Sequence, residues 1–188
     1  MKFVSIDSSL NNTGIAVGTL SNEVISIEKI FLFENGEDIE KKHKDEKKRN
    51  RKKTKECIEK CELTYSNIRN TLQQIGPSSI DIIFIEEPTG SQNSSGMKSY
   101  GATCNLIGVL KGYFKVETVN ADEAKIASVG NKKATKREII DWSHKLHPNL
   151  EWETHRTGKS KGQLKDKNEH MADAIAIGYA GIKNITRS

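Results

Sequence analysis

Three acidic side chains and one imidazole stand at the ends of apolar segments, where they could bind metal ions. Asp7 ends the run FVSID, and Glu86 ends the run DIIFIE. His170 and Asp173 are three residues apart near the start of the last apolar segment, so a helix there would place both on one face. A carboxylate at the end of a buried strand is costly unless it is paired or binds a cation.

Each acid taken alone has a simpler explanation. Asp7 could cap the turn that follows its strand, and Asp173 with Glu169 could complement the dipole at a helix N-terminus. This explanation weakens for the whole set, because the apolar segments are expected to lie side by side. Carboxylates gathered in this way repel one another unless divalent cations lie between them, and oxygen ligands suit Mg²⁺ or Mn²⁺. Two such ions about 4 Å apart would fit phosphodiester cleavage.

The elements that would position these residues are strands followed by helices and further strands. Two β-branched runs joined by a short polar loop predict a hairpin over 2–18, and EVISIEKIFLF predicts a third strand, antiparallel to the second. Two more strands are predicted at 81–86 and 115–119. Helices are predicted at 57–75, 98–114, 121–127, 136–147 and 169–182, and a loop at 151–168. The pattern indicates the α/β class.

Two segments stand out from this pattern. Residues 34–60 are dominated by charge and cannot bury enough apolar surface to join a core. They favour a solvated helix or mobile excursion over a basic arm that contacts phosphates, and both can hold because a mobile arm can order on binding. Gly101, Gly108 and Gly112 lie inside the predicted helix 98–114 and indicate the close approach of another backbone, from this chain or from a second subunit.

The composition fits a single domain with a polyanionic partner. The chain has 188 residues, 30 Lys and Arg against 25 Asp and Glu, and a net charge of +5. Its three cysteines follow no CxxC spacing and fit reduced thiols. No apolar run reaches transmembrane length and no signal-peptide pattern is present, so we expect a cytoplasmic protein without a membrane partner.

The ordered set of motifs resembles the RuvC-type Holliday junction resolvases of the RNase H-like superfamily. FVSIDSSLNNTGIAV resembles the opening hairpin of the family, IIFIEEP its second acidic motif and EHMADAIAIGYA its closing motif. NADEAKIASVGNKKATKREIIDW resembles the region that carries two basic residues near the scissile phosphate. The resemblance implies one RNase H-like domain over 1–188, a five-stranded mixed sheet with its first three strands antiparallel and flanking helices, and a charged insertion at about 34–60. Ser8-Ser9 in place of the usual Pro-Gly indicates a divergent branch, viral or organellar, which would act in a host cell if viral.

The resemblance also assigns roles to residues. Two Mg²⁺ or Mn²⁺ ions per active site would be held by Asp7, Glu86, His170 and Asp173, and these four residues with Lys125 would be catalytic. Nucleic acid would be bound by Lys98, Tyr100, Lys132, Lys133, Lys136 and Arg137. Basic residues in the loops 130–137 and 156–167 would hold phosphates, with little sequence information. Glu87 and Glu169 rank below their neighbours, because Glu87 is expected on the other face of its strand and Glu169 off the His170–Asp173 face.

The function implied is cleavage of four-way DNA junctions by paired symmetric nicks that leave a 5′-phosphate and a 3′-hydroxyl. Such a protein would act as a homodimer, with the helix 98–114 as the candidate interface. Two alternatives stay open: a nuclease for other branched substrates such as flaps, forks or RNA–DNA hybrids, and a non-catalytic binder of DNA structures. An actin-like ATPase is disfavoured, because it would need a second glycine-rich phosphate loop and about twice the length.

Overall fold

The computed structural model describes residues 1–36, 39, 49–90 and 94–187. Its centre is a five-stranded sheet in the order β3-β2-β1-β4-β5, in which β2 runs antiparallel to β1 and β3, while β4 and β5 run parallel to β1. The strands are β1 Lys2–Ser8, β2 Asn12–Ser21, β3 Val24–Glu34, β4 Ile82–Glu86 and β5 Val116–Val119. The predicted mixed sheet, with its first three strands antiparallel, is confirmed.

The pairing of β1 with β4 brings two acidic residues to one edge of the sheet. The parallel register aligns Phe3 with Ile82 and Ile6 with Ile85. The next residues along the two strands are Asp7 and Glu86. Because parallel strands end at the same edge of a sheet, the two carboxyl groups are placed together by backbone pairing alone.

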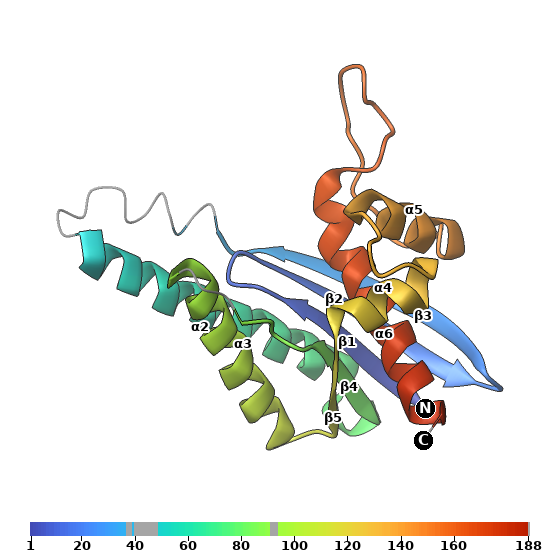
Figure 1. Cartoon of the computed structure of the whole chain (residues 1–188), viewed down its shortest axis with the longest axis horizontal. Coiled ribbons are helices and arrows are strands. Elements are labelled where there is room, and N and C mark those ends of the chain that lie inside the picture. The colour runs from blue at the N-terminus through green and yellow to red at the C-terminus, as the bar shows by residue number, and fades with distance from the viewer. Residues whose placement is uncertain (37–38, 40–48, 91–93, 188) are drawn as a thin grey trace.

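Helices cover both faces of the sheet. On one face lie α2 Arg49–Ile75 and α3 Ser94–Lys111, and on the other α4 Ala121–Val129, α5 Lys136–Leu146 and α6 Glu169–Arg187 (Figure 1). Alternation along β1 divides the core accordingly: Val4 and Ile6 pack with residues of α2 and α3, and Phe3 packs with residues of α6. None of the helices in the described part of the chain is long and apolar enough to cross a membrane.

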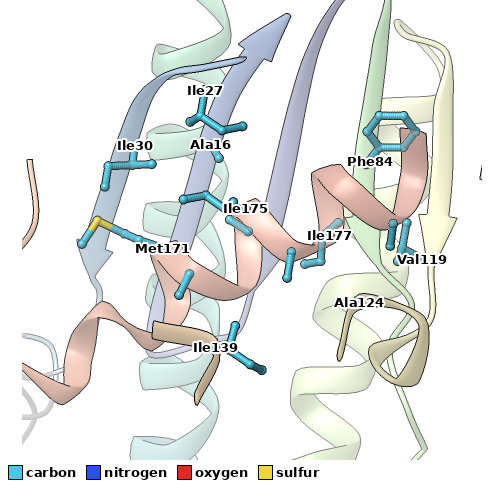
Figure 2. Packing of buried hydrophobic residues seen from close by; sticks show 14 of the residues in the cluster. Ala16, Ile27, Ile30, Phe84, Val119, Ala124, Ile139, Met171, Ile175 and Ile177 are labelled. Carbon is cyan, nitrogen blue, oxygen red and sulfur yellow. The ribbon is translucent and has the colours of Figure 1, made fainter. Parts of the chain in front are cut away.

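The last helix forms the centre of the larger core. Figure 2 shows Ile175 and Ile177 of α6 between the sheet residues and Ala124 and Ile139 of α4 and α5. Small residues let α6 lie close to the strands, and a Cβ built on Gly181 would overlap the ring of Phe84. This close packing fixes where the first turn of α6 meets the edge of the sheet.

The helix predicted at 57–75 begins earlier, at Arg49. Opposite charges four residues apart, such as Lys55 and Glu59, favour a helix in this charged stretch. The apolar anchors of α2 are Ile68 and Leu72, which are 1% and 4% exposed. The rest of the charged insertion, at 37–38 and 40–48, lies outside the described residues.

The glycines of α3 have no close neighbour within the described part of the chain. A Cβ built on Gly101 or Gly108 would meet nothing within 4 Å, and one on Gly112 would meet only the carbonyl of Val109 in its own turn. The glycines predicted the close approach of a backbone from this chain or from a second subunit. The described part of this chain supplies no such backbone, so the second subunit stays a prediction.

The segment 151–168 contains no strand or α-helix, as the predicted loop requires, but it has local backbone pairing that the sequence did not indicate. Thr154 forms an antiparallel bridge with Leu164, and a 3₁₀ turn at Asp166–Asn168 leads into α6. The segment lacks the alternating apolar residues that mark a strand in a sequence, so the sequence did not predict the pairing of Thr154 with Leu164.

Candidate active site

Asp7 and His170 meet although 163 residues separate them in the chain. The Nδ1 atom of His170 lies 2.7 Å from Oδ2 of Asp7, and the two side chains are 16% and 13% exposed. Burial lowers the pKa of His170, but the hydrogen bond and charge of Asp7, together with Glu169 and Asp173, raise that pKa above its ordinary value. The pair therefore joins the end of β1 to the first turn of α6.

Gly14 makes this contact possible. It is the partner of Asp7 in the β1–β2 register. A Cβ built on Gly14 would overlap the backbone carbonyl of His170, so the first turn of α6 rests directly on the backbone of β2. Only glycine leaves room for this approach.

Glu86 and Asp173 complete the group of acids. Burial, and after it the charge of Asp7, raise the pKa of Glu86 to about 7, although Lys125 and His170 oppose the shift. Burial also raises the pKa of Asp173 to about 7, together with the charges of Asp7 and Glu86. The three acids are therefore close enough to repel one another, and the site is short of positive charge.

Two lysines face these acids across a small cavity. The cavity has a volume of about 200 Å³ and is lined by Glu86, Asp173, Lys125 and Lys136, with apolar atoms from α4 and α5. Lys125 lies on α4, and its charge lowers the pKa of Glu86. The structure thus brings together all five residues predicted as catalytic, namely Asp7, Glu86, Lys125, His170 and Asp173.

Glu169 also belongs to this group, contrary to the expectation that it lies off the His170–Asp173 face. Its Oε1 lies 3.4 Å from Nε2 of His170, and its Oε2 lies 2.6 Å from Nζ of Lys136. The hydrogen bond from Lys136 to Glu169 raises the pKa of the lysine. At the first position of α6 a side chain can turn back toward the site, and helical spacing alone does not show this.

The donor set fits hard divalent cations. Asp7, Glu86, Glu169 and Asp173 offer carboxylate oxygens, which Mg²⁺ and Mn²⁺ prefer, and His170 adds one imidazole. Within the described ranges no group of three or more His, Cys, Asp or Glu side chains is already arranged around a metal position. In this arrangement Oδ2 of Asp7 is paired with Nδ1 of His170, and Oε2 of Glu169 with Nζ of Lys136.

The other residues predicted to bind nucleic acid are exposed, and Tyr100 lines a cavity together with Glu86. Lys98 and Tyr100 lie on the first turns of α3, and Lys132 and Lys133 lie on the turn before α5. Arg137 has partners within the chain, since its Nε lies 3.0 Å from Oδ1 of Asp141 and its Nη1 donates to the carbonyl of Leu164. Glu87 is exposed, as expected for the opposite side of the strand end.

Comparisons with known proteins identify the fold. No family model matches the sequence, and no curated protein matches it. Thermus thermophilus RuvC is 14% identical, with a TM-score of 0.61 over 100% of this chain and 96% of that chain. The same protein in complex with a Holliday junction substrate is 13% identical, with a TM-score of 0.62 over 100% and 97%.

A viral enzyme has the same fold. The Fowlpox virus resolvase in complex with Holliday junction DNA is 13% identical, with a TM-score of 0.55 over 98% of this chain and 99% of that chain. In each comparison almost the whole of both chains is aligned. The chain therefore has the RNase H-like fold of the RuvC-type Holliday junction resolvases.

Proposed function

We propose that this protein is a metal-dependent endonuclease that resolves four-way DNA junctions by paired symmetric nicks. The observation that carries the proposal is the meeting of Asp7, Glu86, His170 and Asp173 from β1, β4 and α6, in a fold shared with two junction resolvases. Both of those resolvases have been solved in complex with a Holliday junction, which supports branched DNA as the substrate here.

Asp7, Glu86, His170 and Asp173 would hold two Mg²⁺ or Mn²⁺ ions, with Glu169 beside them. When bound, such ions activate water and stabilise negative charge on the phosphate. The hydrogen bond to Asp7 fixes the orientation of the His170 ring. The ammonium of Lys125 stabilises charge that develops on the phosphate, because it faces the same cavity as Glu86. Water attacks phosphorus and the bond to the 3′-oxygen breaks, which leaves a 5′-phosphate and a 3′-hydroxyl.

Paired nicks require two active sites, so the proposal includes a homodimer. The surface of α3 and the turn after it exposes large apolar side chains, since Met97, Val109 and Tyr113 are 51%, 43% and 81% exposed. A groove of about 670 Å³ runs between α2 and α3, next to Val109 and Tyr113. Gly101 and Gly108 leave room on α3 for a second backbone, which supports α3 as the interface.

The activity is tested with a synthetic immobile four-way junction, with a linear duplex and a flap as controls. We expect Mg²⁺ or Mn²⁺ to support two symmetric nicks in the junction and little cutting of the duplex. If the protein cleaves flaps or forks but makes no symmetric nicks in the junction, its function would be that of a broader branched-DNA nuclease and not of a resolvase. If the protein binds the junction tightly but cleaves no substrate with added metal, its function would be that of a non-catalytic binder of DNA structures.

The repulsion among the acids predicts a specific pH dependence of stability. Because the pKa values of Glu86 and Asp173 are about 7 in the folded protein, against ordinary values of 4.5 and 3.8, the folded protein holds protons that the unfolded chain has lost. Their contribution to stability is therefore present at low pH and is lost as the pH rises through about 7. Without metal, we expect these groups to lower the Tm between pH 5.5 and pH 8 by about 5–10 °C.

Added Mg²⁺ should raise the Tm more at pH 8 than at pH 5.5, because cation binding requires the deprotonated carboxylates. The control is the double variant Glu86→Gln, Asp173→Asn, which keeps the neighbouring charges of Asp7, Glu169, His170 and Lys125. Its Tm should change less with pH and respond weakly to Mg²⁺. Identical pH profiles for the double variant and the wild type would contradict the assigned repulsion.

A further inference from the structure

Residues 153–165 form an ordered hairpin, here called the basic hairpin. His155 N donates to the carbonyl of Gln163, Gly162 N donates to the carbonyl of His155, and both distances are 2.9 Å. The tip turns at Gly158 and Gly162, whose φ angles of 80° and 83° suit glycine. Figure 1 shows the hairpin projecting from the body of the protein, beyond the N-terminal end of α6. Its shape is thus set by its own backbone bonds.

The charge of the hairpin is entirely positive between its two ends. The segment 154–165 holds Arg156, Lys159, Lys161 and Lys165 and no acidic residue. Lys165 is paired with Glu153 at 3.1 Å. Arg156, Lys159 and Lys161 are exposed, and none of them forms an ion pair with any residue of 1–36, 39, 49–90 or 94–187. Three like charges on one small tip repel one another, and a polyanion would relieve that repulsion.

The root of the hairpin is fixed to the helix that carries the site. Asn168 is fully buried, accepts a hydrogen bond from Glu153 N at 2.9 Å and donates one to Glu153 O at 2.8 Å. Lys167 reaches Glu34 at the end of β3, with an Nζ–Oε2 distance of 2.8 Å. His170 follows Asn168 by two residues, so the root and the site share one rigid segment.

We propose that the basic hairpin binds the sugar-phosphate backbone of a DNA arm beside the active site. This inference rests on the proposed function, since it names a surface that holds the substrate. The acids of the site repel phosphates, so the substrate needs cations at its flanks. The hairpin supplies them at the same edge of the sheet, and because it is already ordered, binding costs little conformational entropy. Phosphate contacts of this kind position the DNA without reading its sequence.

The test compares two triple variants in a junction-binding assay with EDTA, which prevents cleavage. The first is Arg156→Gln, Lys159→Gln, Lys161→Gln. The matched control is Lys29→Gln, Lys115→Gln, Arg187→Gln, which removes the same charge from exposed residues on β3, just before β5 and at the end of α6. We expect the first variant to bind a four-way junction at least about tenfold more weakly at 0.1 M salt. Its slope of log K against log salt should be shallower by about 2–3, while the control stays close to the wild type.

The outcomes separate this inference from the proposed function. Equal affinity and equal salt slope for the hairpin variant and the control would overturn the hairpin as a DNA contact. A wild type that binds no junction would overturn both the hairpin and the nuclease proposals. Hairpin-dependent binding without cleavage in Mg²⁺ or Mn²⁺ would support the hairpin and overturn the nuclease. Because only exposed side chains are changed, both variants should keep the wild-type Tm, which excludes unfolding as the cause.

Discussion

Glu86→Gln should reduce junction cleavage by on the order of a hundred- to a thousandfold, while Glu87→Gln, one residue further along the chain, should leave it nearly unchanged. Each substitution replaces a carboxylate by an amide of the same shape, so the two variants differ only in where the lost charge stood. The effect expected for Glu86 comes from losing an anionic metal ligand that Gln cannot replace.

The structure gives the two adjacent acids different surroundings. Glu86 is partly buried and lines the cavity with Lys125 and Asp173. Glu87 is exposed, and its backbone N–H donates to the carbonyl of Val119 at 2.8 Å, which continues the pairing with β5. Successive side chains along a strand point to opposite sides, so only the first of the two faces the site.

Stability separates a catalytic effect from a folding defect. The burial and like charges that raise the pKa of Glu86 to about 7 mean that its ionised form is unfavourable without metal. Glu86→Gln should therefore keep or raise the Tm of the metal-free protein at pH 8 while it abolishes cleavage. Equal losses of cleavage in the Glu86 and Glu87 variants, or a Glu86 variant with full activity, would contradict the assigned site.

The sheet and the main acids could be predicted from the sequence because each leaves a local signal. Apolar β-branched runs mark β1 and β4, and in parallel strands the residues after such runs share an edge. The expectation that these runs lie side by side, together with the family resemblance, therefore predicted that Asp7 and Glu86 meet, and the parallel pairing of β1 with β4 places them at one edge. The three-residue spacing of His170 and Asp173 in an apolar helical segment predicted that both side chains lie on one helix face, from which they could join the two acids.

The basic charge of the segment 156–167 was predicted to hold phosphates, but its hairpin shape and the position of Glu169 could not be predicted, because both depend on partners distant in the chain. Glu169 turns toward the site because Lys136 lies opposite on α5, 33 positions earlier, with an Nζ–Oε2 distance of 2.6 Å. The hairpin depends on Asn168, whose buried amide binds both backbone groups of Glu153. A polar residue in a charged loop gives no sign that it will be buried.

Gly14→Ala should lower both stability and cleavage, although it adds only one methyl group. The added Cβ would overlap the carbonyl carbon and oxygen of His170 and lie 2.9 Å from Met171 N. These are backbone atoms at the start of a helix that is buried along most of its length, so they cannot turn aside as a side chain would. We expect a destabilisation of about 3 kcal/mol, or roughly 5–10 °C in Tm.

The loss of cleavage should exceed what the remaining folded fraction explains, because the overlap lies directly at the site. Gly14 faces Asp7 in the β1–β2 register, and relief of the overlap moves α6 away from β2. That displacement separates His170 from Asp7, and shifts of about 1 Å in a positioned group cost on the order of a hundredfold in rate. Gly90→Ala is the control for stability, since its Cβ would meet nothing within 4 Å and its φ is not positive. An unchanged Tm and unchanged cleavage in Gly14→Ala would show that β2 and α6 can separate without disturbing the site, and the close approach at Gly14 would then not be what holds the acids together.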